Sequence, residues 1–387
     1  MISRRRFLQL SAAVAASTLC PIPSRLSYGQ ELFESRAIFD ESLSWITEHS
    51  AHSLCQRIKQ AGFNVLMPCV WHGRGTSWPS SLAPWDSYKL EELARWNSSF
   101  DPFGKLVEIA AQYQIEIHPW FSVMQRQRNF FPQFYGPGTP DEGFDVHRAD
   151  FRTFITDLIL ECISRYPVQG VNLDYIRSIT ICQSPTCVQE YRSLTDRNLM
   201  VDRLSYGVST EAREAIADWN ERSVGDIVRR VSGHVRKHQP HMLVSICGHP
   251  GHPNLYIQGQ KSVKWSDEGL IDVIYDMRYP AEPNWDEIRA VQKTMKRPEA
   301  YAVLCGNYDV IGTQRTPISS AGARVASHIT HGRQIAQGNG VGLYLYNLLN
   351  EDQITALSSG PFHLPARPRW SRAFSREPAS PTGLFVQ

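Results

Sequence analysis

DFRTFITDLILECISRYPVQGVNLDYIR, residues 150–177, contains a complete helix–strand unit and ends on charged and aromatic side chains. Its first part, 150–166, has apolar residues at the spacing of a helix, and 170–174 is an apolar run of strand length that stops at Asp174. A strand without polar alternation is typical of a parallel sheet that is covered on both faces. The stretch therefore predicts a β/α unit with a carboxylate at the end of its strand.

The same pattern recurs along the chain. Strands are expected at residues 36–40, 64–71, 115–121, 170–174, 242–248, 271–279, 301–306 and 341–348, and helices at 52–63, 101–114, 150–166, 210–237, 284–295 and 319–337. The second of these helices begins with Asp101 as N-cap and Pro102 at the first helical position. Eight alternating strands predict an α/β fold of the (β/α)8 (TIM) barrel type, in one catalytic domain over 30–360. The alternative is a doubly wound open sheet, but no glycine-rich phosphate turn follows the first strand.

Composition limits the partners of the chain. Forty basic residues against 38 acidic ones give a net charge of +2, so the chain carries no electrostatic footprint for nucleic acid or anionic lipid. No internal segment has the length and apolarity of a membrane span, and no cofactor-binding pattern stands out. We therefore expect a neutral or weakly charged partner, and neither a cofactor nor a membrane span.

Both ends of the chain differ from the barrel in composition. Residues 3–8, SRRRFL, resemble the twin-arginine export signal, and a short uncharged run, 8–19, follows. We predict an export signal over 1–29 and a periplasmic or extracellular location. The carboxyl end, 361–387, is rich in Pro, Arg and Ser and is expected to be an extended tail, packed on the barrel or partly disordered.

Cysteine spacing gives one structural hypothesis. Cys182 and Cys187 flank Ser-Pro in a predicted loop, and an exported protein could close that loop with a disulfide. The alternative is that both thiols stay free, because the twin-arginine route carries folded proteins. The other cysteines lie in apolar runs and are expected to be small core residues.

In a β/α barrel the carboxyl ends of the strands form the active site, so the residues that end the strands are candidates for chemistry. Asp174 and Asp276 end the fourth and sixth strands, and we expect these two carboxylates to face each other across one pocket. Glycoside cleavage needs such a pair, one as proton donor and one as nucleophile or base. Asp40, Glu282 and Asp286 are the reserve carboxylates. The expected substrate-binding residues are Asp40, Trp71, His72, His118, Trp120, Tyr175, Arg177, His249, Arg278, Tyr279 and Asn347.

Large aromatic side chains favour a carbohydrate ligand, because sugar rings stack on Trp and Tyr. Trp71, Trp78, Trp85, Trp96 and Trp120 are concentrated in the expected loops after strands two and three, and Trp265 follows later. Each of them alone is more often a core residue. Their concentration predicts a sugar cleft.

Several of these segments together resemble the glycosyl-hydrolase-like 10 family of exported sugar hydrolases, and more distantly the clan of barrels that includes α-galactosidases. They are 61–75 (AGFNVLMPCVWHGRG), 115–121 (IEIHPWF), 150–177 and 268–279 (EGLIDVIYDMRY), within a similarity that covers roughly 36–349. The resemblance implies a (β/α)8 barrel that hydrolyses O-glycosidic bonds of a polysaccharide, with cell-wall glycan as one substrate class. It also implies a strand-four nucleophile, matching Asp174, and a strand-six acid/base, matching Asp276.

The sequence departs from this pattern at both strands. Asn172 stands where the clan often has a lysine, and Asp276-Met277-Arg278 precedes Tyr279 where the family often has Pro-Gln. Three hypotheses therefore remain open. The chain is a retaining glycoside hydrolase, a catalytically silent glycan-binding barrel, or a metal-dependent hydrolase that uses His249 and His252 of GHPGHP. The first is the favoured interpretation, with no metal.

Overall fold

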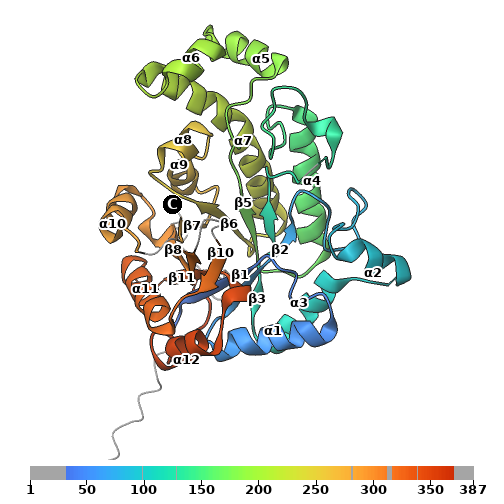
Figure 1. Ribbon diagram of the computed structural model, residues 1–387, viewed down its shortest axis with the longest axis vertical. Coiled ribbons are helices and arrows are strands. Elements are labelled where there is room, and N and C mark those ends of the chain that lie inside the picture. Colours follow the sequence, from blue (N-terminus) through green and yellow to red (C-terminus); the bar gives the residue numbers. More distant parts are fainter. Residues whose placement is uncertain are drawn as a thin grey trace, which may run out of the picture. The chain divides into compact units, whose positions relative to one another are not determined.

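The strands of the protein close into a parallel barrel (Figure 1). The computed structural model describes residues 32–369 except 98, 128, 280, 281, 312–315 and 338, and the predicted export signal lies outside this range. The barrel strands are β1 (Ser35–Asp40), β2 (Val65–Trp71), β3 (Glu116–Ile117), β4 (Trp120–Ser122), β5 (Gly170–Asp174), β6 (Leu243–Gly248), β7 (Val273–Arg278), β8 (Tyr301–Gly306) and β11 (Gly340–Tyr344). They pair in the order β1-β11-β8-β7-β6-β5-β4-β2, and β1 also pairs with β2. This ring confirms the predicted (β/α)8 barrel.

The third barrel position is built from two short strands. β3 pairs with the first half of β2, and β4 pairs with its second half and with β5. The register of β2 shifts between Cys69 and Trp71, where it meets β4. This interrupted position replaces the continuous third strand expected from the sequence, and it brings Trp120 beside the upper half of β5.

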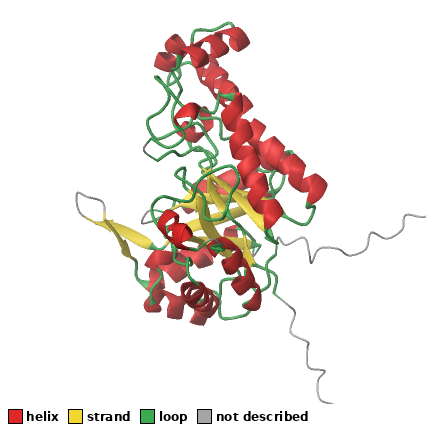
Figure 2. Ribbon diagram, turned by 90° about the vertical axis from the view of Figure 1, so that its right-hand side faces the viewer, coloured by secondary structure: helices red, strands yellow, loops and turns green. Residues whose placement is uncertain are grey.

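Helices surround the barrel (Figure 2). They are α1 (Glu48–Gln60), α2 (Leu90–Trp96), α3 (Pro102–Gln112), α4 (Ala149–Arg165), α5 (Pro185–Thr195), α6 (Leu199–Ser205), α7 (Thr210–His238), α8 (Pro253–Ile257), α9 (Ser262–Asp267), α10 (Trp285–Thr294), α11 (Gly322–Ile335) and α12 (Glu351–Ser359), with 3₁₀ turns η1 (Pro132–Phe134), η2 (Pro298–Ala300) and η3 (Tyr346–Leu348). The predicted cap of α3 is confirmed, since the Asp101 carboxylate accepts a hydrogen bond of 2.9 Å from the Gly104 N–H. None of the described helices has the length and apolar character needed to cross a membrane.

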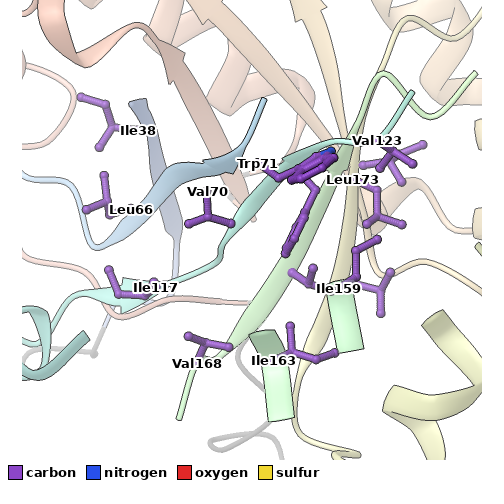
Figure 3. Packing of buried hydrophobic residues seen from close by; sticks show 14 of the residues in the cluster. Ile38, Leu66, Val70, Trp71, Ile117, Val123, Ile159, Ile163, Val168 and Leu173 are labelled. Carbon is purple, nitrogen blue, oxygen red and sulfur yellow. The ribbon is translucent and has the colours of Figure 1, made fainter. Parts of the chain in front are cut away.

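Strand side chains alternate between two packed layers. Those that point into the barrel, such as Phe39, Met67, Tyr275 and Leu304, form an inner cluster. Those that point outward pack against the helices in a larger outer cluster, part of which appears in Figure 3 around Leu173. Because successive residues of a strand point to opposite sides, the position of each strand-end side chain follows from counting along its strand.

Two segments differ from the sequence-based expectation. The stretch 181–210, expected to be irregular, contains α5 and α6, which lie beside the end of α7 that is remote from the barrel (Figure 1). After β8 the chain forms an antiparallel hairpin of β9 (Tyr308–Ile311) and β10 (Thr316–Ser319), which projects from the barrel in Figure 2. These insertions have their own local packing, so they do not follow the barrel repeat.

The described part of the carboxyl tail, 361–369, packs at the amino-terminal end of the barrel strands. Arg36 at the start of β1 donates a hydrogen bond of 2.9 Å to the Leu364 carbonyl, and its guanidinium lies 4.4 Å from the centre of the Phe362 ring. Arg36 also pairs with buried Glu34 at 2.6 Å. This segment begins with a turn at 361–362 and packs on the barrel, and 370–387 lies outside the described residues.

Candidate active site

A cavity of about 570 Å³ opens at the carboxyl ends of the strands. Its lining combines carboxylates, aromatic rings and amides from the loops after at least five barrel positions. The lining residues are Glu41, Ser42, His72, Arg74, Tyr88, Trp120, Ser122, Gln125, Gln127, Asp174, Tyr175, Arg177, Met277, Tyr279, Tyr344 and Asn347. Seven of the sequence-predicted site residues are among them: His72, Trp120, Asp174, Tyr175, Arg177, Tyr279 and Asn347.

Asp174 is held at the inner edge of this cavity by two fixed donors. Its Oδ2 accepts a hydrogen bond of 3.1 Å from the Trp120 indole N–H, and its Oδ1 accepts one of 2.6 Å from the Tyr175 backbone N–H. Burial raises the pKa of Asp174, while the charge of Arg177 and both hydrogen bonds oppose that rise. The carboxylate is thus oriented toward the cavity with donors that stabilise its ionised form.

The backbone after Asp174 is strained. Tyr175 has φ 48°, in the left-handed region that a side chain disfavours. This conformation accompanies the short hydrogen bond from its own N–H to Asp174. The Arg177 guanidinium lies 4.5 Å from the centre of the Tyr175 ring, and its buried Nη1 has no hydrogen-bond partner among the described residues. Both side chains are therefore available to a ligand beside the carboxylate.

The end of β1 carries two acidic residues that point to opposite sides. Phe39 is in the inner cluster and Ile38 in the outer one, so Asp40 points outward and Glu41 inward. Asp40 accepts hydrogen bonds from the Ser42 hydroxyl at 2.6 Å and the Ser44 N–H at 3.1 Å. The structure therefore corrects the expectation that Asp40 binds substrate, because its oxygens fix a loop while Glu41 lines the cavity.

Asp276 occupies an outward position on β7, where Tyr275 points into the barrel. It accepts hydrogen bonds from Arg278 Nε at 3.0 Å and from the Tyr301 hydroxyl, and Arg278 also pairs with Glu287 of α10 at 3.0 Å. Burial raises the pKa of Asp276 to about 6. The expectation that Asp276 faces Asp174 across one pocket is wrong, as is the placement of Arg278 in the cleft, because alternation along β7 directs both toward the helices.

The reserve carboxylates also lie outside the cavity lining. Glu282 contacts His328 Nε2 at 3.4 Å, and Asp286 forms an exposed pair with Arg289 at 3.0 Å.

Two predicted sugar-stacking residues are structural. Trp71 is buried in the outer layer (Figure 3). Its ring centre lies 5.5 Å from that of Phe131 and 6.0 Å from that of Phe154. His118 is buried beside Gly170 at the start of β5, the end remote from the cavity, and its Nε2 lies 3.4 Å from the Glu116 carboxylate. Neither lines the cavity. The register shift in β2 turns the Trp71 side chain toward the helices. The interruption between β3 and β4 leaves His118 near the amino-terminal ends of the strands, away from the cavity.

Most of the other tryptophans that suggested a sugar cleft are also packing residues. Trp78 and Trp265 are fully buried in the outer layer, and Trp85 packs against it. The Trp78 indole donates to Glu161 at 3.1 Å and that of Trp265 to Glu221 at 3.0 Å. Tyrosines instead dominate the aromatic part of the cavity, with Trp120 as its tryptophan.

His249 lines a separate cavity of about 540 Å³ together with His252. The two rings have centres 5.0 Å apart. Arg213, Lys261 and Lys264 line the same cavity, and their positive charge disfavours a cation there. This placement corrects the expectation that His249 binds substrate beside Asp174, and it removes support from a histidine-bound metal.

The two loop cysteines lie close together. Their sulfur atoms are 2.7 Å apart and unbonded in the structure, and Cys187 Sγ is 3.6 Å from Asp145 Oδ1. Among the described residues, these three side chains are also the group that could hold a metal. Two sulfurs this close suit a disulfide better than a shared ion, and the disulfide remains a prediction.

The sequence analysis missed two kinds of cavity residue. Glu41 follows the expected end of its strand by one position, and Tyr344 lies inside the run 341–348 that was expected to continue as a strand. Counting inward positions along each strand would have found both. Arg74, Tyr88, Gln125 and Gln127 come from long loops, and no periodic signal marks them.

Comparison with known proteins bears on the family and the fold of the chain. The model of the glycosyl hydrolase-like 10 family matches residues 38–131 and 144–301. The glycosyl hydrolase DigH of Escherichia coli K12 is 22% identical over 210 residues, which cover 47% of this chain and 43% of DigH. The chain therefore spans less than half the length of that curated relative.

Solved structures share the barrel. The PgaB (BpsB) glycoside hydrolase domain from Bordetella bronchiseptica has a TM-score of 0.58 at 13% identity, over 86% of this chain and 97% of that domain. A β-galactosidase from Marinomonas ef1 has a TM-score of 0.57 at 9% identity, over 84% of this chain and 58% of that one. These likenesses support the fold, and the family match over most of the barrel shows that the chain belongs to the glycosyl hydrolase-like 10 family.

Proposed function

We propose that this protein is a retaining glycoside hydrolase that cleaves O-glycosidic bonds of a polysaccharide, with cell-wall glycan strands as the first substrate class to test. The observation that carries the proposal is Asp174, fixed at the inner edge of the cavity by the Trp120 and Tyr175 N–H groups. Its position at a strand end matches the place where a β/α barrel performs chemistry. Membership of a hydrolase-like family supports the same reaction class.

The surroundings of Asp174 suit a sugar. Tyr279 and Tyr344 stack with ring centres 4.5 Å apart and form an aromatic wall of the cavity. Gln125, Gln127 and Asn347 offer amide groups for hydroxyls. Burial lowers the pKa of His72 to about 4, so this residue is a neutral hydrogen-bonding group at pH 7. Aromatic faces and neutral polar groups are what a glycan needs.

In this mechanism the Asp174 carboxylate attacks the anomeric carbon and forms a glycosyl ester as the bond to the leaving sugar breaks. Arg177, 4.5 Å from the Tyr175 ring, stabilises the carboxylate before attack and offers its free Nη1 to a substrate oxygen. Water then hydrolyses the ester, and the product keeps its anomeric configuration.

The experiment measures reducing-end release from peptide-free peptidoglycan glycan strands, chitin, cellulose, starch and galactan. Asp174→Asn should bind the cleaved substrate but lose nearly all turnover. Asp101→Asn, which retains an N-cap at α3, is the matched control and should cut like the wild type. If Asp276→Asn abolishes turnover in a folded protein, the strand-six residue has the role that the resemblance implied.

A glycan-binding barrel without catalysis is the second candidate. The position of Asp276 favours this alternative. Its carboxyl group is hydrogen-bonded to Arg278 and Tyr301, so β7 contributes no carboxylate to the cavity. Calorimetric binding of one of these glycans without any reducing-end release would support it over the hydrolase.

We also propose that the protein is exported, on the basis of Arg4 and Arg5 in the SRRRFL segment. Replacing both arginines by lysine should retain the protein in the cytoplasm of a bacterial host, as measured by cell fractionation. Equal export of the variant and the wild type would contradict the twin-arginine route, and retention of the wild type in the cytoplasm would contradict export.

A further inference from the structure

We propose that Glu41 is the second catalytic carboxylate, the proton donor to the leaving-group oxygen. The inference rests on the proposed glycoside hydrolase function and adds a residue at the end of β1 to it. The starting point is that Asp276, the acidic residue of β7, is not among the described residues that line the cavity. A glycosidase with Asp174 as nucleophile requires a second acidic group in the same cavity.

The fold places Glu41 and Asp174 in one cavity. Inward positions on β5 are Gly170, Asn172 and Asp174, and the Asn172 side-chain amide donates a hydrogen bond of 3.0 Å to the Ser245 hydroxyl on the neighbouring strand β6. On β1 the inward side chain Phe39 is followed, two residues later, by Glu41. Both acids therefore lie on the cavity side of the inner layer. Two barrel positions, those of β2 and of β3 with β4, separate β1 from β5.

Aromatic side chains connect the two acids. The Tyr344 hydroxyl donates to Glu41 Oε2 at 2.9 Å, while the Trp120 indole donates to Asp174 at 3.1 Å. The Tyr344 and Trp120 rings are in edge contact, with centres 6.3 Å apart. One packed aromatic pair thus orients both carboxyl groups.

The two carboxyl groups have different hydrogen-bond donors and different charged neighbours. Burial raises the pKa of Asp174, while an N–H donor on each of its oxygens and the charge of Arg177 oppose that rise. Glu41 has the Tyr344 hydroxyl as donor, while Asp40 and Asp174 add negative charge. Burial and these two carboxylates raise the pKa of Glu41, while the Tyr344 hydrogen bond and the charge of Arg74 oppose that rise. Glycoside cleavage uses one protonated acid and one ionised nucleophile, and the two N–H donors and the Arg177 charge suit Asp174 to the second role.

The reaction balances with these two groups. Glu41 transfers its proton to the glycosidic oxygen, which keeps the bonding pair as the C–O bond breaks and Asp174 bonds to the anomeric carbon. The Glu41 carboxylate then removes a proton from water, whose oxygen displaces Asp174 from that carbon. Both acids return to their starting states.

Glu41→Gln tests the inference because it preserves the size of the side chain and an acceptor for Tyr344. On the polysaccharide that the wild type cuts, turnover should fall by about 10²- to 10⁴-fold, the usual contribution of a general acid. On a 2,4-dinitrophenyl glycoside of the same sugar the ester should form at nearly the wild-type rate, because that leaving group needs no proton. Azide should accelerate Glu41→Ala and yield a glycosyl azide.

The outcomes separate the two proposals. If Asp174→Asn is inactive but folded Glu41→Gln cuts the polysaccharide normally, the hydrolase stands and the role of Glu41 is overturned. If Glu41→Gln loses the same factor on both substrates and azide has no effect, Glu41 is not the acid and only supports the fold or binding. If the wild type cuts none of the glycans, both proposals fail.

Tyr344→Phe provides a second measurement that a purely structural role would not affect. The Tyr344 hydroxyl lowers the pKa of Glu41, so its removal should raise that pKa. A proton donor is active below its pKa, and the alkaline limb of the kcat/KM profile should therefore move to higher pH. An unmoved limb in an active variant would contradict the assignment.

Discussion

A carboxylate at a strand end can serve chemistry or structure, and its immediate neighbours decide which. Asp174 faces a cavity and accepts hydrogen bonds from N–H groups that leave it open to a ligand. Asp276 faces the helices and accepts hydrogen bonds from Arg278 and from the Tyr301 hydroxyl. Asp174 ends β5 and Asp276 lies two residues before the end of β7, and the sequence analysis placed both in one pocket because it did not assign the side of the sheet that each faces.

Asp276 should make the stability of the protein depend on pH. Burial raises its pKa from 3.8 to about 6, so the folded state keeps a proton that the unfolded chain loses. The stabilising contribution is complete below pH 4 and is lost as the pH rises to about 6. Urea unfolding between pH 4 and 7 should show wild type losing stability relative to Asp276→Asn. A constant difference between the two proteins would refute this.

Trp120→Phe should change the pH profile of glycan cleavage without removing the ring. Loss of the indole N–H removes a hydrogen bond that lowers the pKa of Asp174. The nucleophile must be ionised, so the acidic limb of kcat/KM should move to higher pH. Asp101→Asn, far from this hydrogen bond, is the control, and identical limbs in both variants would show that the indole does not tune Asp174.

At the scale of elements, strands were more predictable than the loops that join them. All eight barrel positions were recognisable because their buried runs lack polar alternation, and α3 because Asp101 and Pro102 mark its start. The two-part third position and the β9–β10 hairpin were missed, since both depend on tertiary pairing. The layer to which a side chain points was also missed, and that error misplaced Asp40, Trp71 and Asp276.

Gly170 at the start of β5 should be intolerant of a side chain. An added Cβ would lie 2.6 Å from Nδ1 of buried His118, whose ring has little room to move. Gly170→Ala is expected to lower the free energy of unfolding by about 1–3 kcal/mol through overpacking. The matched control is Gly136→Ala, where no atom lies within 4 Å of the new Cβ. Equal urea midpoints for both would contradict the packing described for His118.

At the scale of the whole molecule, the described tail residues complete the amino-terminal end of the barrel. Phe362 is buried against Phe63, with ring centres 5.3 Å apart, and against the Arg36 guanidinium. Composition suggested an extended segment and left its packing open, because contacts between residues as far apart in the sequence as Arg36 and Leu364 leave no local pattern.

Phe362→Ala should therefore destabilise the entire barrel. Removal of a buried phenylalanine ring costs about 3–5 kcal/mol, and here it would also uncover Arg36. Thermal unfolding should show one transition at a lower temperature, with Phe362→Leu in between. A small separate transition with an unchanged main one would mean that the tail unfolds on its own.

The alternation along β7 has a consequence for how a new active site could arise in this chain. Met277, next to Asp276, points inward and lines the cavity. A single substitution, Met277→Glu, would therefore supply an acid from a different strand without moving the backbone. In a Glu41→Gln background we expect it to restore part of the lost glycan cleavage, measured as reducing ends, while Asp276→Glu should restore none. The barrel can thus relocate a catalytic function between strands by point mutation, provided that the side chain changed is on the inner side.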